Sequence, residues 1–158
     1  MLCRMEPVEE LRYLILAAQR DGNRALAALL RPLGVTPAQA EAIGVLARAK
    51  APLTVRELGD RLVCEPGSPS RLVSSLADAG LVSRRPHPGD ARASTLELSS
   101  QGRRTAAAIR RVERRFHDDL GARLTSARDT DAALRTLRRL TDEGASAAAL
   151  RRRLDDAS

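Results

Sequence analysis

A basic turn between two strand-like runs limits the fold of this chain more than any other stretch does. The segment from Arg84 to Leu98 reads RRPHPGDARASTLEL: prolines and a glycine occupy its centre, and polar and apolar residues alternate at its end. Proline and glycine interrupt regular structure, whereas alternation with period two is typical of a half-buried strand. Residues 81–83 and 95–98 are therefore predicted to pair as a hairpin with a stiff, positively charged tip.

Two capping boxes before the hairpin predict two short helices. In TPAQ (residues 36–39) and TVRE (residues 54–57), a threonine side chain can accept from the backbone three residues later while a Gln or Glu side chain reaches back. A third helix is expected from about Ser68 to Gly80, because glycine suits the left-handed residue that ends a helix. The expected core residues of the three helices are Ile43, Leu46 and Ala47; Val55, Leu58 and Leu62; and Leu72, Val73 and Leu76.

Longer amphipathic helices are predicted on both sides of this middle region. An apolar stripe covers residues 11–33, with Gly22 and Asn23 expected to weaken the helix midway. After the hairpin, a second stripe covers residues 109–120 and ends at Gly121. One last helix is expected to carry Leu134, Leu137, Leu140, Leu150 and Leu154. The terminal stripes offer more apolar surface than a small domain covers, so a homodimer is expected.

The order of these elements is that of a winged helix-turn-helix. The predicted fold is mainly α, with a winged helix-turn-helix and a two-stranded wing (residues 35–100) flanked by N-terminal (1–34) and C-terminal (101–158) dimerisation helices. Two short helices can hold a third against a core so that its outer face enters a major groove. The wing then reaches sideways along the duplex, and the prolines in its tip reduce the conformational entropy lost on docking.

The charge of the chain favours the same kind of partner. Basic residues outnumber acidic ones by 27 to 20, a net charge of +7, and Lys50 is the only lysine. A GC-rich coding sequence explains the choice of arginine over lysine but not the excess of positive charge. An excess of this size favours a polyanion, either nucleic acid or an acidic membrane face.

Composition argues against several other classes of protein. Two distant cysteines, Cys3 and Cys64, are too few for a disulfide framework or a zinc site and suit a reducing cytoplasm. The two histidines have no metal-ligand spacing and no nucleophile is paired with a base, so no metal, cofactor or catalytic site is expected. No apolar run has the length of a secretory signal or a membrane span. We therefore expect a soluble cytoplasmic protein that is not an enzyme.

Several motifs in the middle of the chain resemble the MarR family of bacterial transcription regulators. The matching segments, between Leu33 and Arg104, are VTPAQ, LTVRELGDRL, SRLVSSLADAGLVSRR, GDAR and LSSQGRR. The resemblance implies a dimer held by the flanking helices, a palindromic operator, and release from DNA by a small molecule or an oxidant. One segment differs: the family commonly has Ser or Thr with Arg or Lys before the recognition helix, where this chain has VCEPGSPS (residues 63–70). These prolines and the glycine imply a restricted helix start and leave open which first-turn residues face the bases.

The outer face of the third helix supplies the first group of candidate DNA contacts. These candidates are Ser68, Ser70, Arg71, Ser74 and Ser75. Arg71 can donate two hydrogen bonds to the O6 and N7 atoms of guanine, and serines bind phosphates or bases. The alternative is a solvated surface, with Ser68 as a helix cap. We favour DNA contact for Arg71 and leave the serines open.

The wing supplies the second group of candidate contacts. By the resemblance, Asp90 and Arg92 match an Asp-x-Arg pair in which the arginine reaches the minor groove and the aspartate orients neighbouring arginines. The negative potential of a narrow groove favours an arginine there. An ordinary exposed turn is the alternative, mainly for Asp90. Arg84 and Arg85 are candidate phosphate contacts, and only one of them is expected to face DNA because side chains alternate along a strand.

Three kinds of function are weighed against these residues. The favoured one is a dimeric, sequence-specific transcriptional regulator, expected to be a repressor, that binds double-stranded DNA at a palindromic operator and responds to a small-molecule effector. Family members that sense oxidants through a cysteine near the first helix make Cys3 a candidate redox residue, with a weaker case for Cys64. A winged-helix protein-interaction module without DNA binding is the alternative from another class, and an enzyme has no supporting residues. Because Tyr13 and Phe116 are the only aromatic residues, an aliphatic effector, or none, fits as well as an aromatic one.

Overall fold

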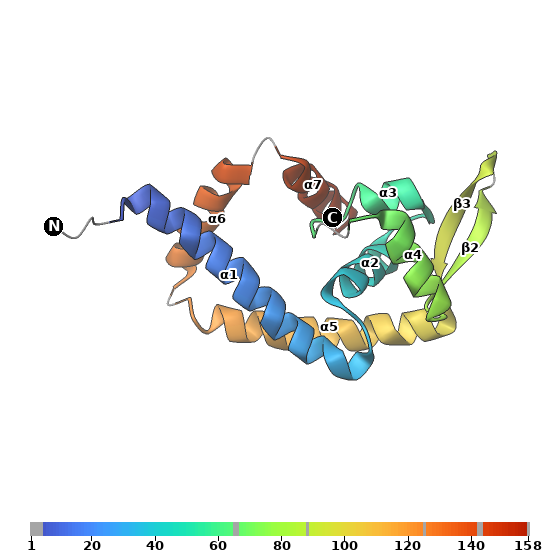
Figure 1. Ribbon diagram of the computed structural model, residues 1–158, viewed down its shortest axis with the longest axis horizontal. Helices are drawn as coiled ribbons and strands as arrows, with labels where there is room; N and C mark the ends of the chain where they lie inside the picture. The colour runs from blue at the N-terminus through green and yellow to red at the C-terminus, as the bar shows by residue number, and fades with distance from the viewer. Residues whose placement is uncertain (1–4, 65–66, 88, 125, 142–143, 158) are drawn as a thin grey trace.

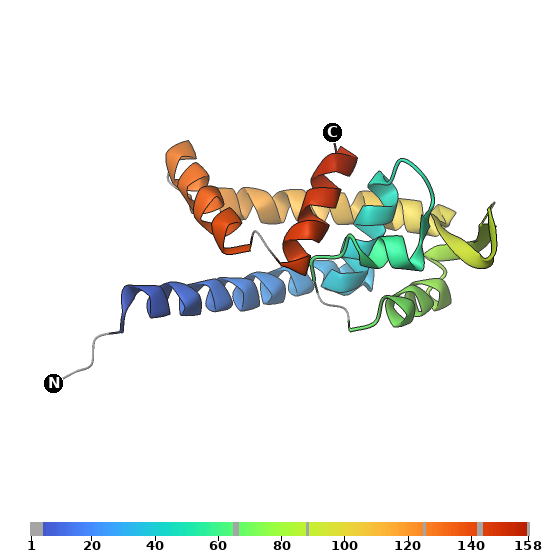
Figure 2. The ribbon, with the colours of Figure 1, turned by 90° about the horizontal axis from the view of Figure 1, so that it is seen from above.

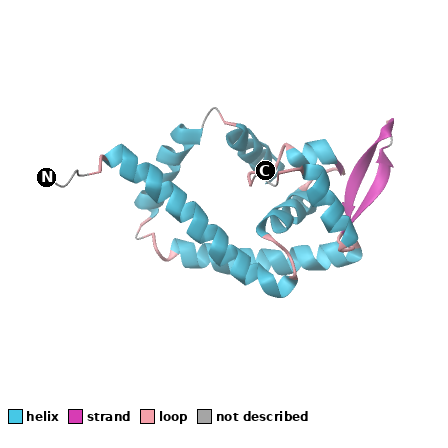
Figure 3. Ribbon diagram, viewed as in Figure 1, coloured by secondary structure: helices cyan, strands magenta, loops and turns pink. Residues whose placement is uncertain are grey.

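The computed structural model describes residues 5–64, 67–87, 89–124, 126–141 and 144–157, and helices dominate it (Figures 1 and 3). The helices are α1 (Pro7–Leu30), the short 3-10 helix η1 (Arg31–Leu33), α2 (Pro37–Arg48), α3 (Val55–Gly59), α4 (Pro69–Asp78), α5 (Ser100–Gly121), α6 (Ala127–Thr141) and α7 (Ala145–Ala157). The strands are β1 (Leu53–Thr54), β2 (Val82–His87) and β3 (Asp90–Leu98). This arrangement confirms the predicted fold class, a mainly helical winged helix-turn-helix with flanking helices.

Both predicted capping boxes are present, and they start α2 and α3. The Thr36 hydroxyl accepts from the Gln39 backbone at 3.2 Å, while the Thr36 backbone donates to the Gln39 side chain at 2.9 Å. Thr54 and Glu57 repeat the arrangement at 3.2 and 2.7 Å. Gly80 has the predicted left-handed conformation, with φ at 68°, just after α4 ends. These local signals confirm the predicted starts of α2 and α3 and the predicted glycine stop after α4.

The three strands form an antiparallel sheet in the order β1-β3-β2. β2 and β3 make the wing, in which Val82 pairs with Leu98 and the register shifts just after Pro86. Both strands extend further towards the tip than predicted, because β2 is an edge strand, where a proline is tolerated. β1, which pairs Leu53 with Leu96, was not predicted, because two residues in front of a capping box show no alternation.

A single core joins the winged region to α5 and to the end of α1. Its most deeply buried side chains are Leu30, Ile43, Leu58, Val73, Leu76, Leu96 and Ile109. The predicted inner residues of α3 and α4 lie in this core or pack against it, but Ala47 of α2 is exposed, while Ala42 and Val45 are buried. Because α2 contacts α1, α4 and α5, neighbours cover more of its surface than one stripe. The predicted core side of α2 is therefore confirmed for Ile43 and Leu46 and wrong for Ala47.

The flanking helices differ from the prediction in two places. α1 continues without a break across Gly22 and Asn23, and a methyl group on Gly22 would lie 3.9 Å from the Phe116 ring, so packing against α5 supports this part of the helix. The predicted last helix is two helices, α6 and α7, with Gly144 immediately before α7. The chain turns between them, so that α7 lies against α2 and the residues that follow α3 (Figures 1 and 2). A repeated apolar spacing in the sequence does not reveal such a turn.

α1 and α6 keep much of their apolar surface exposed. Val8 is 78% exposed, and Leu14 and Leu140 are each 58% exposed. A hollow of about 390 Å³ between the two helices is lined by Val8, Leu11, Arg12, Ile15, Leu16 and Leu140. None of the helices in the described ranges combines the length and the apolar character that a bilayer crossing requires. Exposed apolar patches of this kind mark contact sites in folded proteins.

Candidate DNA-binding surface

α4 and the β2–β3 hairpin lie at the same end of the molecule, away from the start of α1 (Figures 1 and 2). α4 packs against α2, α3 and β2, and its inner residues Leu72, Val73 and Leu76 enter the core. The hairpin projects beyond the core beside it. The fold therefore brings the two groups of predicted contact residues, on α4 and on the wing, to one end of the molecule.

The outer face of α4 presents three of the predicted residues, Ser70, Arg71 and Ser74, to solvent. Within the described residues, the Arg71 side chain makes no hydrogen bond or ion pair, so none of these residues occupies its donors. The first turn of α4 also carries no acidic residue. The N-terminal part of this face thus presents the Arg71 guanidinium and the Ser70 and Ser74 hydroxyls, which are donors that match phosphate oxygens and the acceptor edge of guanine.

Ser75 and Ser68 lie in different surroundings from these three residues. The half-buried Ser75 hydroxyl donates to the Leu72 carbonyl at 2.8 Å and accepts from Gln39 Nε2 at 3.2 Å. It therefore joins α4 to α2 and does not lie on the exposed face where the sequence placed it. Ser68 is half-buried and occupies the N-cap position of α4, as the alternative interpretation expected, but its side chain makes no capping hydrogen bond.

A glutamate of α2 holds the turn that leads into α4. The Glu41 carboxylate accepts the backbone N–H of Val63 at 2.9 Å and that of Cys64 at 3.0 Å. At the end of the turn, Pro69 lies so close to Gly59 that a methyl group on the glycine would be 2.9 Å from the proline ring. Pro69 opens α4, as the restricted helix start predicted, and residues 65–66 lie outside the described part. Sequence reasoning missed Glu41, because its partners are 22 and 23 residues away.

Arg84 and Arg85 leave β2 on opposite faces of the wing. Arg84 pairs with the buried Leu96, which puts it on the face that continues from the core. Arg85 lies on the other face, where its Nε contacts the Glu97 carboxylate at 3.2 Å. Both arginines are exposed, but Glu97 offsets part of the charge of Arg85. Arg84 is therefore the better candidate for a phosphate contact.

Asp90 and Arg92 belong to β3, and Asp90 pairs with His87 across the wing. Their side chains lie outside the described part of the chain. The predicted roles of Arg92 in the minor groove and of Asp90 as its orienting partner therefore stay predictions.

The two candidate redox residues differ in what can be said of them. Cys3 lies outside the described residues. Cys64 is half-buried, and burial together with the neighbouring Glu41 raises the pKa of its thiol to about 12. Because the thiolate is the reactive form, a thiol in these surroundings reacts slowly at neutral pH. Cys64 has the environment of a packing cysteine, not of a sensor.

The base of the wing is joined to α4 and α5 through the motif LSSQG. Ser99 caps α5 by accepting from the Gly102 backbone at 2.9 Å, and it donates to the Gly80 carbonyl at 2.6 Å. A methyl group on Gly102 would lie 2.0 Å from the Leu81 carbonyl oxygen. The absence of a side chain at position 102 thus lets the end of α4, the wing and α5 meet, which sets the angle between recognition helix and wing.

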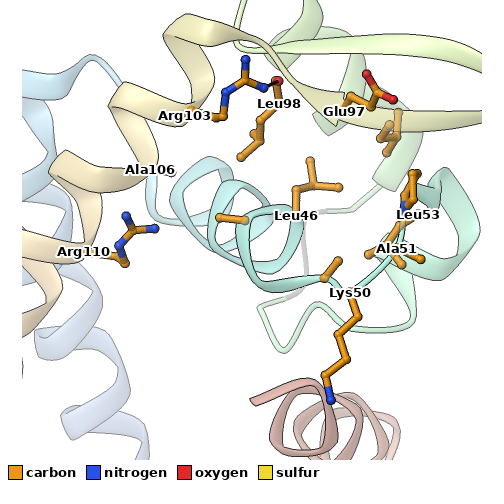
Figure 4. A pocket seen from close by; sticks show the side chains of 13 residues that line it. Leu46, Lys50, Ala51, Leu53, Glu97, Leu98, Arg103, Ala106 and Arg110 are labelled. Carbon is orange, nitrogen blue, oxygen red and sulfur yellow. Dashed lines mark hydrogen bonds between the residues drawn. The ribbon is translucent and has the colours of Figure 1, made fainter. Parts of the chain in front are cut away.

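A cavity of about 480 Å³ opens between α2, the base of the wing and α5. Its lining includes Leu46, Lys50, Ala51, Leu53, Glu97, Leu98, Arg103, Ala106 and Arg110 (Figure 4). Arg103 and Arg110 come from α5, and Arg103 donates to the Leu98 carbonyl at 2.6 Å. Apolar side chains, three basic groups and one acid line the cavity, so it suits a small molecule with an apolar body and a negative group.

Comparison with known proteins agrees with this geometry. A profile of the MarR family matches residues 33–93, which run from the end of η1 into the wing. The exopolysaccharide II synthesis transcriptional activator ExpG of Rhizobium meliloti (strain 1021) is 31% identical over 132 residues, which are 83% of this chain and 68% of ExpG. The chain belongs to the MarR family.

Two further proteins are similar to this chain. The uncharacterized HTH-type transcriptional regulator ML2140 of Mycobacterium leprae (strain TN) is 35% identical over 82 residues, 52% of this chain and 57% of that protein. A crystal structure of a mutant MarR from E. coli complexed with operator DNA matches with a TM-score of 0.75 and 25% identity, over 84% of this chain and 94% of the E. coli chain. The family resemblance carried by the five sequence motifs is thereby confirmed.

Proposed function

We propose that this MarR-family chain is a cytoplasmic transcriptional regulator that binds a palindromic DNA operator as a homodimer and represses transcription from it. The exposed face of α4, with Arg71 between Ser70 and Ser74 and a basic wing beside it, carries this proposal. A helix whose inner face is buried in the core can place its outer face in the major groove, while the wing lies along the adjacent DNA backbone. The E. coli MarR structure that contains operator DNA supports the same use of this fold.

The dimer is proposed from the apolar surface that one chain leaves uncovered. We assign residues 1–34 and 101–158 to dimerisation and residues 35–100 to DNA binding. Exposed side chains such as Leu14 on α1 and Leu137 on α6 would be buried between two copies. A two-fold axis would place two recognition helices in successive major grooves, roughly 34 Å apart, which requires a palindromic site.

The cavity between α2, the wing base and α5 is the proposed effector site. Its walls belong both to α5 and to the strands that carry the wing, so an occupant would change the angle between them. Aliphatic walls with basic groups favour an aliphatic carboxylate over a flat aromatic ligand. Calorimetric titration with medium-chain fatty acids tests this site. Arg110→Ala should weaken the binding of an anion, and the same loss with an uncharged analogue would contradict the proposal.

DNA binding is tested by fluorescence anisotropy with the duplex upstream of the chain's own coding sequence. The full-length chain should bind this duplex far more tightly than a scrambled duplex of equal length. Equal affinity for the two duplexes would show that the chain binds DNA only non-specifically, as a polyanion. No binding to either at low salt would overturn the proposal in favour of a protein-interaction module.

The direction of regulation is tested separately, because ExpG is named as an activator. A reporter gene placed behind the bound promoter should be expressed less when the chain is present. Higher expression would keep the DNA-binding function and replace repression with activation.

A further inference from the structure

Among the described residues, hydrogen bonds from or to three side chains of the C-terminal helix α7 connect it to the winged region. They are Arg61 with Asp156 at 2.8 Å, Arg152 with the Asp60 carbonyl at 2.9 Å, and Arg153 with Glu41 at 2.5 Å. The four charged side chains of the two ion pairs are at most 28% exposed. Solvent therefore screens these pairs less than it screens pairs on an open surface. Ala147 and Ala149 of α7 are also buried, so the helix is packed as well as paired.

Glu41 is the residue at which α7 meets the turn before the recognition helix. Its side chain is only 12% exposed, and it accepts the backbone N–H groups of Val63 and Cys64 as well as a hydrogen bond from Arg153. One carboxylate thus joins α2, the turn and α7. Because a carboxylate with so little contact with water is costly unless it is paired, Arg153 stabilises Glu41 in the position where it holds the turn.

The turn held by Glu41 leads directly to the DNA-facing side chains. α4 begins at Pro69, and Arg71 lies in its first turn. Leu62, at the start of the turn, is buried in the core, and Pro69, at its end, packs against Gly59. Between these two anchors, the hydrogen bonds from Val63 and Cys64 to Glu41 restrain the backbone.

We propose that Glu41 and Arg153 are positioning residues for DNA recognition: α7, docked through Arg153, keeps the turn before α4 in the arrangement in which α4 enters the major groove. The inference rests on the proposed DNA-binding function. Arg153 acts through Glu41, and Glu41 acts through the backbone at residues 63 and 64. A turn that is already ordered loses less entropy when DNA binds, so docking of α7 strengthens binding.

The contact between Arg153 and Glu41 lies on the helix that follows α6, one of the helices proposed for dimerisation. α7 follows α6 after residues 142–144, and α6 carries Leu134, Leu137 and Leu140 as exposed apolar side chains. A shift of α6 would move the start of α7 and change the contact between Arg153 and Glu41. α7 would then couple the dimer interface to the recognition helix through side chains in contact.

Five substitutions in the chain isolate the role of α7. Arg153→Ala removes the contact with Glu41, and Asp156→Ala removes the second ion pair. Asp155→Ala is the matched control for Asp156→Ala, because it removes the same charge from the neighbouring, exposed position of the same helix. Arg153→Lys keeps the positive charge and should restore most of the contact. Arg139→Ala, on the exposed surface of α6, serves as the control for the loss of one positive charge.

Two measurements report on the turn without DNA. Hydrogen exchange at the amides of Val63 and Cys64 should become faster in Arg153→Ala and Asp156→Ala than in the controls, because the acceptor Glu41 is held less firmly. Alkylation of Cys64 by iodoacetamide, followed in a Cys3→Ser background, should also become faster. Its thiol, whose pKa burial and Glu41 raise to about 12, becomes more exposed when α7 moves away.

DNA affinity completes the test. With the promoter duplex that the unchanged chain binds, Arg153→Ala and Asp156→Ala should bind about five-fold more weakly or worse. Asp155→Ala, Arg139→Ala and Arg153→Lys should stay close to the unchanged chain, and thermal melting should show every variant folded.

The outcomes separate this inference from the proposed function. If the unchanged chain binds its promoter and both α7 variants bind it equally well or more tightly, the positioning role is overturned while the DNA-binding function stands. Unchanged amide exchange in Arg153→Ala overturns the positioning role as well. If the unchanged chain does not bind the promoter, the proposed function is overturned, and the positioning role with it.

Discussion

Arg71 is the residue on which base recognition should depend most. Arg71→Ala removes two donors that can meet the O6 and N7 atoms of guanine, so it should cost about 1–3 kcal/mol per half-site and relax the preference at one base pair. Titration against the operator and its single-base variants measures both effects. Arg115→Ala, exposed on α5, removes the same charge and should change neither. An equal loss of affinity for the operator and for a scrambled duplex would show that Arg71 contacts only the phosphate backbone of the DNA.

Arg84 and Arg85 form a matched pair for testing the wing. Arg84→Ala should reduce the slope of log affinity against log salt by about one unit per half-site, because each subunit loses one phosphate contact. Arg85→Ala should reduce it less, since Glu97 already offsets its charge. Arg92→Ala, predicted from the Asp-x-Arg motif, should weaken binding to many sequences evenly. If Arg92→Ala leaves both affinity and salt slope unchanged, the wing tip is an ordinary surface turn.

Gly102 should be among the positions of α5 most sensitive to substitution. Gly102→Ala places a methyl group 2.0 Å from the Leu81 carbonyl, so the wing and α5 must separate, at a cost of about 2 kcal/mol or more. Gly121→Ala at the other end of the helix is the control, because a methyl group there meets nothing within 4 Å. Urea unfolding measures the difference between them. Equal stability of the two variants would show that the chain relaxes around position 102.

At the scale of elements, Gln39 joins two helices that the sequence shows only separately. Its side chain accepts from the Thr36 backbone and donates to Ser75 of α4. Gln39→Ala loses both hydrogen bonds and should lower the free energy of unfolding by about 1–2 kcal/mol. Gln39→Glu keeps the capping acceptor and loses only the donor to Ser75, so its loss should be smaller. If Gln39→Glu costs nothing, the contact with Ser75 contributes nothing, and if the two substitutions cost the same, the capping hydrogen bond contributes nothing.

The elements also show where pattern reading succeeds. Thr36 and Thr54 start their helices as predicted, because a capping box involves only residues three apart. β1 and the division between α6 and α7 were missed. β1 forms only because β3, some forty residues later, supplies its hydrogen-bonding partner. α7 is separate from α6 and lies in a different direction, in which it contacts α2.

At the scale of the whole molecule, the exposed faces of α1 and α6 predict the quaternary structure. Leu14→Glu and Leu137→Glu place a charge in the proposed interface and should convert a dimer into a monomer in sedimentation equilibrium at micromolar concentration. Ser100→Glu adds the same charge at an exposed position near the wing, outside the ranges assigned to dimerisation, and should leave the mass unchanged. If the unchanged protein has the mass of a single chain, the proposed dimer and the proposed palindromic operator are both wrong.

Local chemistry along the chain specified the starts of α2, α3 and α4, the left-handed Gly80, the wing and the outward direction of Arg71, because each depends on neighbours within a few residues or on a simple period. Long-range packing decided the rest. Ser75 turned inward because Gln39 of α2 lies opposite it, and Glu41 holds the turn before α4 because folding brings residues 63 and 64 to it. α7 lies beside the same turn because Arg153 and Asp156 form ion pairs with Glu41 and Arg61, which are about a hundred residues away in sequence. Such contacts leave no periodic trace in a sequence, since their partners become neighbours only when the core has formed.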